Sequence, residues 1–302
     1  MIRITSELPD GNKSEHIFAD GITYTSQTLD IIPNRDLKSH IDNVCNLEIR
    51  DDDIYLATFP KSGTHWVWEI LVMLRRGNAE YETKTKEAAF LDFQPPEIVE
   101  AIPSPRVLNC HYPCKLTPNG VFRKKVKIVQ VMRNPKDVFV SFYHHHKYFD
   151  KENQIKSFQD YLPRMTGDYG LYHFYPWFQY VKEWERFSKN HPDQIINIYY
   201  EDLKENPVRE IKKLDKFLDT ERSEDLITKI ANACNFENLK KADSEVKVQE
   251  EISEADERPS PMYRKGQVGD WKNYFTVAQN EKVNKWLEDN FVDTELNFRY
   301  TL

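Results

Sequence analysis

A short turn near residue 60 combines glycine, lysine and hydroxyl side chains, and that combination binds anions. The turn runs from Thr58 to Trp66 and reads TFPKSGTHW. An apolar run precedes it and a helix-like pattern follows it, so it joins a strand to the start of a helix. Backbone N–H groups and the helix dipole attract negative charge at such a start, and Lys61 adds a full positive charge. The turn therefore predicts a site for a phosphate-like ligand.

The turn differs from the phosphate-binding loop of nucleotide hydrolases. That loop has two glycines flanking four residues directly before its lysine. Here Pro60 precedes Lys61, and Gly63 comes after it. The turn thus resembles a P-loop in how it would bind an anion, but not in its sequence. A nucleotide-dependent kinase is therefore the disfavoured interpretation.

A second cluster follows another apolar run and begins with Arg133. Asn134 is a good helix N-cap, Pro135 suits the first helical position, and Ser141 lies about two turns further on. An arginine at a strand end beside a helix start predicts a second anion site. The alternative is that Arg133 pairs with a surface carboxylate.

A third cluster places two adjacent cations, Arg264 and Lys265, before Gly266 and Gly269. Glycines let the backbone approach a ligand closely, and both cations can reach its phosphate. Basic glycine loops are frequent, so this cluster gains its meaning only together with the first two.

Histidine is the usual general base near neutral pH, and His111 stands at the end of the apolar run Val107 to Cys110. A structural histidine is the competing interpretation. The run His144 to His146 suggests a metal, but successive residues of a helix point in different directions. No metal site is therefore predicted.

Composition limits the remaining classes. The chain has 302 residues with 39% hydrophobic content, which suits one large core or at most two small ones. A net charge of -7 argues against a nucleic-acid-binding surface. The four cysteines lack the paired spacing of a zinc site, so we expect free thiols in a reducing compartment. No apolar signal segment or run of 18 apolar residues occurs, and we expect a soluble, cytoplasmic protein that binds no membrane.

Strand-like and helix-like stretches alternate along the chain. The expected strands are Ile54 to Phe59, Val107 to Cys110, Val126 to Met132 and Ile195 to Tyr200. The expected helices are Thr64 to Arg75, Pro135 to Tyr148, Pro176 to Lys189, Pro207 to Leu218, Ser223 to Cys234 and Ala278 to Phe291. This alternation predicts an α/β fold with a central parallel β-sheet flanked by α-helices. Ligands of such sheets bind at the carboxyl ends of the strands, where Lys61 and Arg133 both fall.

We expect residues 1–302 to form a single domain. Residues 1–14 are polar and mixed in charge, and we expect residues 1–20 to be flexible. The charged segment Lys240 to Pro261 is predicted to be a long surface loop.

Four phrases occur in one order along the chain: PKSGT-x-W, RNPKDV-x-VS-x-YH, YED-x-KENP and RKG-x-x-GDWKN-x-FT. Together they resemble the cytosolic sulfotransferase family, and the resemblance extends from about Gly21 to Phe298. It implies a single α/β domain with a phosphosulfate-binding turn. It also implies the sulfonate donor 3′-phosphoadenosine 5′-phosphosulfate (PAPS), with PAP as the product.

The resemblance implies a set of donor-binding residues. The 5′-phosphosulfate and the adenine would be held by the first turn: Lys61, Ser62, Gly63, Thr64, His65 and Trp66. The 3′-phosphate would be held by Arg133, Ser141, Arg264, Lys265 and Gly266. The adenine region would include Tyr200, Cys234 and Phe236, although Cys234 replaces a hydroxyl residue of the family.

The resemblance also implies the catalytic groups. His111 would be the base and Lys61 would stabilise the leaving phosphate. The chain departs from the family at Asn109, where the family has a lysine thought to neutralise the sulfonate oxygens. Two interpretations stay open: a working sulfotransferase, or a non-catalytic or weakly active PAPS-binding homologue.

The acceptor would be a small molecule, aromatic or apolar, with a hydroxyl or amine to modify. Candidate pocket residues by position are Tyr24, Phe90, Phe93, Tyr148 and Phe174, and core packing competes with each assignment. The stretch Asp168 to His173 would border the pocket. A homodimer is implied by a short motif that includes Lys272, Thr276, Val277 and Glu281, for which a helix cap at Thr276 is the alternative.

Overall fold

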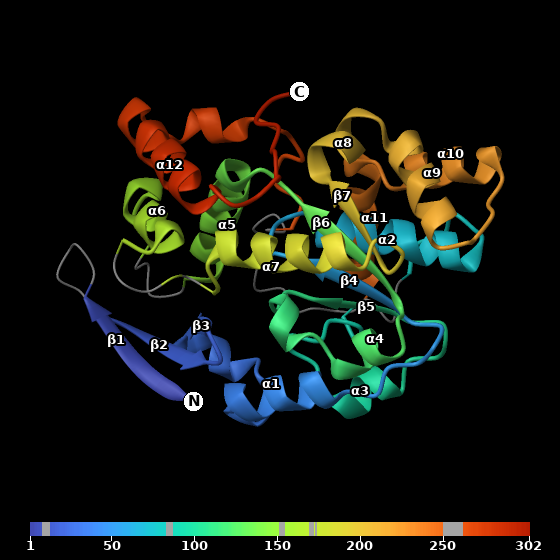
Figure 1. Cartoon of the computed structure of the whole chain (residues 1–302), viewed down its shortest axis with the longest axis horizontal. Helices are drawn as coiled ribbons and strands as arrows, with labels where there is room; N and C mark the ends of the chain where they lie inside the picture. The colour runs from blue at the N-terminus through green and yellow to red at the C-terminus, as the bar shows by residue number, and fades with distance from the viewer. Residues whose placement is uncertain (8–12, 83–86, 151–154, 169–171, 173, 250–261) are drawn as a thin grey trace.

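The computed structural model describes residues 1–7, 13–82, 87–150, 155–168, 172, 174–249 and 262–302. Its centre is a sheet of four parallel strands in the order β5-β4-β6-β7, with helices flanking it (Figure 1). The strands are β4 (Ile54–Thr58), β5 (Val107–Cys110), β6 (Lys127–Met132) and β7 (Ile195–Tyr199). All four coincide with the predicted strands, and the predicted α/β fold is confirmed.

The longer helices are α1 (Leu37–Asn46), α2 (Thr64–Arg76), α5 (Pro135–Phe149), α6 (Phe158–Thr166), α7 (Trp177–Asn190), α9 (Pro207–Phe217), α10 (Glu224–Ala233), α11 (Phe236–Gln249) and α12 (Val277–Asn290). The short helices are α3 (Pro96–Glu100), α4 (Asn119–Arg123) and α8 (Tyr200–Glu205), with 3-10 turns at Ser26–Asp30, Pro33–Arg35, Cys114–Leu116 and Asp270–Asn273. Each predicted helix corresponds to one of these to within two residues at either end.

The central strands form because their sequences are apolar on both faces. Every residue of β4 is buried, as expected of a parallel strand covered by helices on both sides. The chain then turns into α2 through Gly63, which has a φ of 110°, and leaves it through Gly77, which has a φ of 74°. Both values lie in the left-handed region that glycine adopts without strain. The two glycines therefore set the start and the end of the helix that begins at the predicted anion site.

The N-terminus differs from the expectation of a flexible segment. A three-stranded antiparallel sheet consists of β1 (Ile2–Glu7), β2 (Lys13–Ala19) and β3 (Ile22–Thr25). Ile17 and Ile22 are fully buried, so this sheet has an apolar attachment to the body of the protein. Thr23 also exchanges two backbone hydrogen bonds with Phe174, at 2.7 and 2.9 Å. Polar residues around these few apolar positions hid the strands from sequence reasoning.

The segment expected to be a loop from Lys240 onward is partly helical. Helix α11 continues to Gln249, and residues 250–261 lie outside the described part of the chain. Leu239 anchors this helix in the core, while most of its other side chains are polar. An amphipathic helix needs only one apolar face. The apolar face of α11 has few residues, so the surrounding charged residues hid the helical pattern in the sequence.

Two further observations concern composition. Cys45, Cys110, Cys114 and Cys234 are all free thiols, as expected. Within the described ranges, no helix is long and apolar enough to cross a bilayer.

Candidate active site

The first anion-binding turn lies at the carboxyl end of β4, as predicted. The Ser62 N–H donates to the carbonyl of Phe59 at 3.1 Å, which closes the turn. Lys61 itself has a φ of 67°, a strained value for a residue with a side chain. A β-carbon on Gly63 would lie 3.0 Å from the ring of Tyr200, so close approach as well as φ requires glycine there. Strain at such a turn is typical of a ligand-binding element.

Lys61 lies among cations. Burial, and then the charges of Arg133 and Arg264, lower the pKa of Lys61 to about 7. Arg133 is held close by a hydrogen bond from Nη1 to the Lys61 carbonyl, at 3.0 Å. Bringing positive charges together costs free energy that a bound anion can recover. The perturbed pKa therefore indicates an anion site, and a bound anion would raise it.

Arg133 also links the first two clusters to an aromatic wall. Its guanidinium stacks over the ring of Tyr200 at 4.1 Å, and its Nη2 donates to the carbonyl of Gln267 at 3.2 Å. Trp66 meets Tyr200 edge to face, with ring centroids 5.4 Å apart. The structure thus brings Trp66, Arg133 and Tyr200 together, although they are far apart in the sequence.

The third cluster folds against the second through Asp137. The Asp137 carboxylate accepts hydrogen bonds from the N–H groups of Gly269 and Trp271, at 2.7 and 2.9 Å. Asn134 caps the same helix, α5, by accepting from the Asp137 N–H at 2.9 Å. The basic glycine loop is therefore docked on the helix that follows Arg133. Sequence reasoning missed Asp137, whose role depends on a loop about 130 residues away.

Arg264 and Lys265 both donate to Asp270, at 2.6 and 2.7 Å. Although burial alone would raise it, hydrogen bonds from Lys265, Asn273 and Arg264 lower the pKa of Asp270 to about 2. The two cations are thereby held side by side. A β-carbon on Gly266 would lie 2.2 Å from the ring of Phe236, so this loop also contacts the predicted second aromatic wall.

His111 lies just beyond β5 and is bonded to the first turn. Its Nδ1 is 2.8 Å from the Thr58 carbonyl and 3.0 Å from the Thr58 hydroxyl. A carbonyl oxygen can only accept, so Nδ1 carries the proton and Nε2 carries the lone pair. Desolvation, opposed by the Thr58 carbonyl and reinforced by the charge of Lys61, lowers the pKa of His111 to about 4. The imidazole is therefore neutral at pH 7 and can accept a proton at Nε2.

The Thr58 hydroxyl continues this hydrogen-bonded chain to α2. It lies 2.7 Å from the hydroxyl of Thr64. The hydrogen bond between the two hydroxyls extends the chain from His111 through Thr58 to Thr64 at the start of α2. Thr58 was placed in the turn by sequence, but its link to His111 was not predicted.

Asp92 supports the backbone of His111. Its Oδ2 accepts the His111 N–H at 2.9 Å, and the side chain is 0% exposed. Burial raises the pKa of Asp92 to about 7, although its hydrogen bonds oppose the shift. A buried carboxyl that holds the backbone of a candidate base is a positioning group that sequence reasoning missed.

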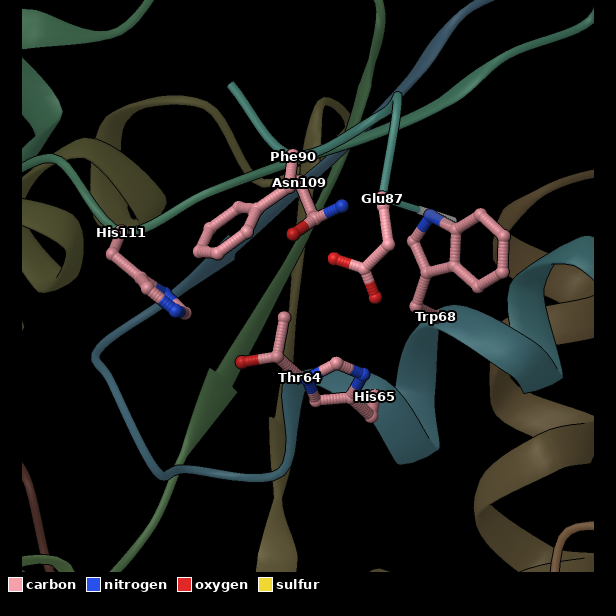
Figure 2. A pocket seen from close by; sticks show the side chains of 7 residues that line it. All are labelled: Thr64, His65, Trp68, Glu87, Phe90, Asn109 and His111. Atoms are coloured by element: carbon pink, nitrogen blue, oxygen red, sulfur yellow. The ribbon is translucent and has the colours of Figure 1, made fainter. Parts of the chain in front are cut away.

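A small cavity of about 20 Å³, room for roughly one water, opens between α2 and β5 (Figure 2). Its lining residues are Thr64, His65, Trp68, Glu87, Phe90, Asn109 and His111. Trp68 and Glu87 were not predicted, because neither stands in a motif with an evident chemical role.

Four of the five predicted pocket aromatics meet beside His111. Phe90 is 4.9 Å and Phe174 is 6.5 Å from the His111 ring, centroid to centroid. Tyr24 contacts Phe174 at 5.6 Å and Phe93 at 6.1 Å. Tyr148, the fifth, contacts Phe149 with ring centroids 4.9 Å apart.

Comparison with known proteins decides the family. The model of the sulfotransferase domain matches residues 51–295. Over 276 residues the chain is 37% identical to Sulfotransferase 1B1 of Canis lupus familiaris, covering 85% of this chain and 90% of that protein. Over 273 residues it is 35% identical to Sulfotransferase 1 family member D1 of Mus musculus, covering 87% and 91%.

The chain belongs to the sulfotransferase family. It is therefore an enzyme of the transferase class. Two solved structures share its fold. A mouse sulfotransferase complexed with PAP is 24% identical with a TM-score of 0.71, over 93% of this chain and 96% of that one. Retinol dehydratase in a complex with retinol and PAP is 23% identical with a TM-score of 0.73, over 95% and 92%.

Asn109 is the main departure of this sulfotransferase from the family phrases. Its Nδ2 donates to the carbonyl of Ala89 at 3.0 Å, and its backbone N–H donates to the same carbonyl at 2.9 Å. The side chain of Asn109, where the resemblance implies a lysine, therefore holds a neighbouring segment.

Two of the predicted donor residues have less support from geometry. Cys234 is buried, with its thiol directed at the sulfur of Met73 at 3.6 Å, and so offers little surface to a ligand. Ser141 lies in α5 as predicted, half-buried, with no described hydrogen bond from its hydroxyl. Most of the stretch 168–173 lies outside the described residues.

His144 and His146 have different hydrogen-bond partners. His144 Nε2 lies 2.8 Å from the Tyr274 hydroxyl, and His146 Nδ1 lies 2.5 Å from the Tyr161 hydroxyl. His144 and His146, two positions apart on α5, thus point to different neighbours.

The candidate dimer segment of this sulfotransferase contains the helix cap that was the alternative. Thr276 accepts from the Gln279 N–H at 3.2 Å, and the Gln279 side chain accepts from the Thr276 N–H at 3.0 Å. Val277, the next residue, is 76% exposed. A cap and an interface are compatible, because the cap uses polar atoms and leaves the apolar side chain outside.

Proposed function

We propose that this sulfotransferase moves a sulfonate group from PAPS to a hydroxyl, or an amine, of a small aromatic or apolar acceptor. His111 is the base, and Lys61 stabilises the leaving phosphate. The observation that carries the proposal is the hydrogen-bonded link through Thr58, which joins the anion-binding turn to His111. The PAP complexes of its structural neighbours support the choice of donor.

The residues present suit a polyanionic donor. The lowered pKa of Lys61 and the left-handed turn at Gly63 both fit a site that receives a phosphosulfate. In the proposal, the backbone of residues 61–66 and the hydroxyls of Ser62 and Thr64 bind the 5′ end. The first N–H groups of a helix have no partner within the helix, so they are available to an anion.

The 3′-phosphate is assigned to Arg133, Ser141, Arg264, Lys265 and Gly266. The pairing of Arg264 and Lys265 with Asp270 supports this assignment, since it aligns two cations on one loop. An arginine side chain can bind a phosphate through two hydrogen bonds. Such binding to the 3′-phosphate would favour PAPS over nucleotides that lack this group. Trp66 and Phe236 are the proposed aromatic walls for adenine, with Tyr200 beside Trp66.

His111 is proposed to take the acceptor proton at Nε2. Its neutral state at pH 7 and its fixed tautomer support that role. The value of about 4 belongs to the protein without ligand. A neighbouring anion stabilises the imidazolium and raises the pKa toward the range of an effective base.

Lys61 is proposed to stabilise charge as it develops on the leaving phosphate. The donor supplies the sulfonate group when bound. Sulfonate transfer makes the same demands as phosphoryl transfer, namely alignment of two oxygens and neutralisation of the leaving one. A lysine that is protonated once the anionic donor is bound meets the second demand.

The acceptor is proposed to lie against Tyr24, Phe90, Phe93 and Phe174. These rings meet beside His111, so an acceptor hydroxyl at His111 would place an aromatic or apolar body among them. Structural neighbours were crystallised with androsterone and with retinol, both apolar alcohols. Tyr148, at the end of α5, remains part of the proposed set.

A second candidate function is a non-catalytic or weakly active PAPS-binding homologue. Asn109 favours it, because its amide is occupied by Ala89 and brings no charge. A transfer assay with labelled PAPS over phenols, steroids, amines and catechols separates the two. Modification of at least one acceptor supports the enzyme, and PAP binding without transfer to any acceptor supports the alternative.

We also propose that the protein acts in the cytoplasm and forms a homodimer through Lys272, Thr276, Val277 and Glu281. The exposure of Val277 supports the dimer, because an isolated apolar side chain at a helix start is suited to a small contact.

A further inference from the structure

A buried carboxyl group lies behind the segments that are proposed to hold the 3′-phosphate and the adenine. Strands β6 and β7 are parallel neighbours, paired up to their last residues (Figure 1). The residues that follow the two strands therefore leave the same edge of the sheet side by side. Arg133 and Asn134 follow β6 directly. Glu201 is the second residue after β7, lies on α8 and is only 1% exposed.

Asn134 joins Glu201 to the start of α5. Oε1 of Glu201 accepts two hydrogen bonds from Asn134, one from its backbone N–H at 2.9 Å and one from Nδ2 at 3.0 Å. Nδ2 also donates to Oδ2 of Asp137, at 3.0 Å. The Asp137 N–H can only donate, so the atom that it meets at 2.9 Å is Oδ1 of the amide. The amide orientation of Asn134 is therefore fixed, and both of its N–H groups are used.

The other end of this network is the basic glycine loop, residues 264–271. The Asp137 carboxylate accepts hydrogen bonds from the N–H groups of Gly269 and Trp271, at 2.7 and 2.9 Å. The same loop carries the two cations that are assigned to the 3′-phosphate. All three side chains of the network are at most 2% exposed. A hydrogen bond lost at such a depth leaves a buried polar group without a partner, which costs free energy.

Arg133 is fixed by the same network, because it directly precedes Asn134. Its guanidinium stacks over the ring of Tyr200, the neighbour of Glu201, at 4.1 Å. Burial raises the pKa of Glu201, whereas hydrogen bonds from Asn134 and the charge of Arg133 lower it. The carboxyl group of Glu201 thus lies close enough to Arg133 to interact with its charge. One set of buried hydrogen bonds therefore sets the position of Arg133 relative to the loop 264–271.

We propose that Asn134 and Glu201 are positioning residues that set how strongly the protein prefers a donor with a 3′-phosphate. They act through Arg133 on one side and the loop 264–271 on the other, and do not touch the donor themselves. This assignment rests on the proposed function, which places the 3′-phosphate between these two segments. Cations that are already in place need no ordering when the phosphate binds. Breaking the network should therefore weaken the hold on the 3′-phosphate more than the hold on the 5′ end.

PAP and adenosine 5′-phosphate test the proposal, because they differ only by the 3′-phosphate. In calorimetric titrations, wild type should bind PAP about a hundredfold more tightly. Asn134→Ser keeps an oxygen that can cap α5 but lacks the side-chain N–H groups that reach Glu201 and Asp137. We expect this variant to lose about tenfold of the preference for PAP, with its affinity for adenosine 5′-phosphate within about threefold of wild type.

Two variants of Glu201 test the same network from its other end. Glu201→Leu removes the acceptor and should reduce the PAP preference by a similar factor, whereas Glu201→Gln keeps an acceptor oxygen and should retain it within about threefold. The matched control is Glu205→Gln on the same helix, where a 46% exposed side chain bonds to Arg299, and it should keep the wild-type ratio. If Asn134→Ser does not fold, the two Glu201 variants decide by the same ratio.

A PAP preference that survives in Asn134→Ser, or an equal weakening of both ligands, would overturn the assignment. A general loss of stability acts on both ligands alike and leaves the ratio unchanged. Calorimetry needs no transfer, so the two proposals can fail separately. If no acceptor is sulfonated but Asn134→Ser selectively loses PAP, the transfer function fails and the positioning role stands. Equal binding of the two ligands to wild type would refute the positioning role whatever the activity.

Discussion

The carbonyl of Thr58 accepts a hydrogen bond from Nδ1 of His111 at 2.8 Å, and this bond joins the end of β4 to the end of β5. The Thr58 hydroxyl adds a second contact to the same nitrogen and a third to Thr64. Because β4 and β5 are parallel and end at the same edge of the sheet, the donor-binding turn and His111 lie side by side. The Thr58 carbonyl at the end of β4 also fixes the His111 tautomer in which Nε2 carries the lone pair.

Thr58→Val tests this link. Valine keeps the shape and the backbone carbonyl but removes the hydroxyl from His111 and Thr64. Each of the two lost hydrogen bonds costs about 1 kcal/mol, so we expect kcat to fall about thirtyfold. Steady-state kinetics with a phenol acceptor measure it. Thr58→Ser restores the hydroxyl and should recover most of the rate, whereas a valine variant with wild-type kcat would mean that Thr58 does not position His111.

Proton uptake on binding PAP tests the state of Lys61. The pKa of Lys61 is lowered to about 7 by burial and neighbouring cations, and a bound anion raises it. Above pH 7 the free protein has lost this proton and must regain it, so affinity for PAP should weaken as pH rises from 7 to 9. Calorimetry in buffers of different ionisation enthalpy should show uptake of up to about one proton at pH 8. Lys61→Met should bind without that uptake; an unchanged uptake in this variant would assign the proton to another group.

Asn109→Lys tests the missing charge. A lysine at 109 restores a cation near the sulfonate but gives up the side-chain bond to Ala89. We expect kcat to rise several-fold, because charge at the reacting centre contributes more than one neutral hydrogen bond. Asn109→Met, which removes the bond without adding charge, is the control. Equal turnover of wild type and Asn109→Lys would show that the site works without that charge.

Val277→Asp tests the proposed dimer. A charge in place of an exposed apolar contact should convert the protein to a monomer at micromolar concentration, as measured by light scattering. The fold should be unaffected, because Val277 is 76% exposed and the capping bonds use Thr276 and Gln279. A wild-type protein that is already monomeric would contradict the dimer.

The sequence predicts helices and strands well where apolar residues recur regularly or where a glycine or proline marks the end of an element. The four central strands are mostly apolar, α2 begins after a glycine and α5 begins at a proline capped by Asn134, so their positions could be predicted. The N-terminal sheet could not, because its stability depends on burying Ile17 and on pairing with Phe174, which is distant in the sequence. Helix α11 was hidden for a similar reason, since its few apolar contacts are tertiary.

The same distinction applies to the site. Lys61, Arg133, Arg264 and His111 stand in phrases whose residue types carry their chemistry. Asp92 does not, because it gains its meaning from the pairing of a neighbouring segment with β5. A carboxylate in a loop is ordinary in sequence and becomes informative only when the fold places it at a base.

The most direct test of the central claim is transfer of labelled sulfonate from PAPS to a phenol by wild type and by His111→Ala, with PAP affinity measured on both. General base catalysis contributes about 10²- to 10⁴-fold. We therefore predict that kcat of His111→Ala falls at least about a hundredfold while its affinity for PAP stays within about threefold of wild type. A His111→Ala variant that transfers sulfonate at the full rate would contradict the account.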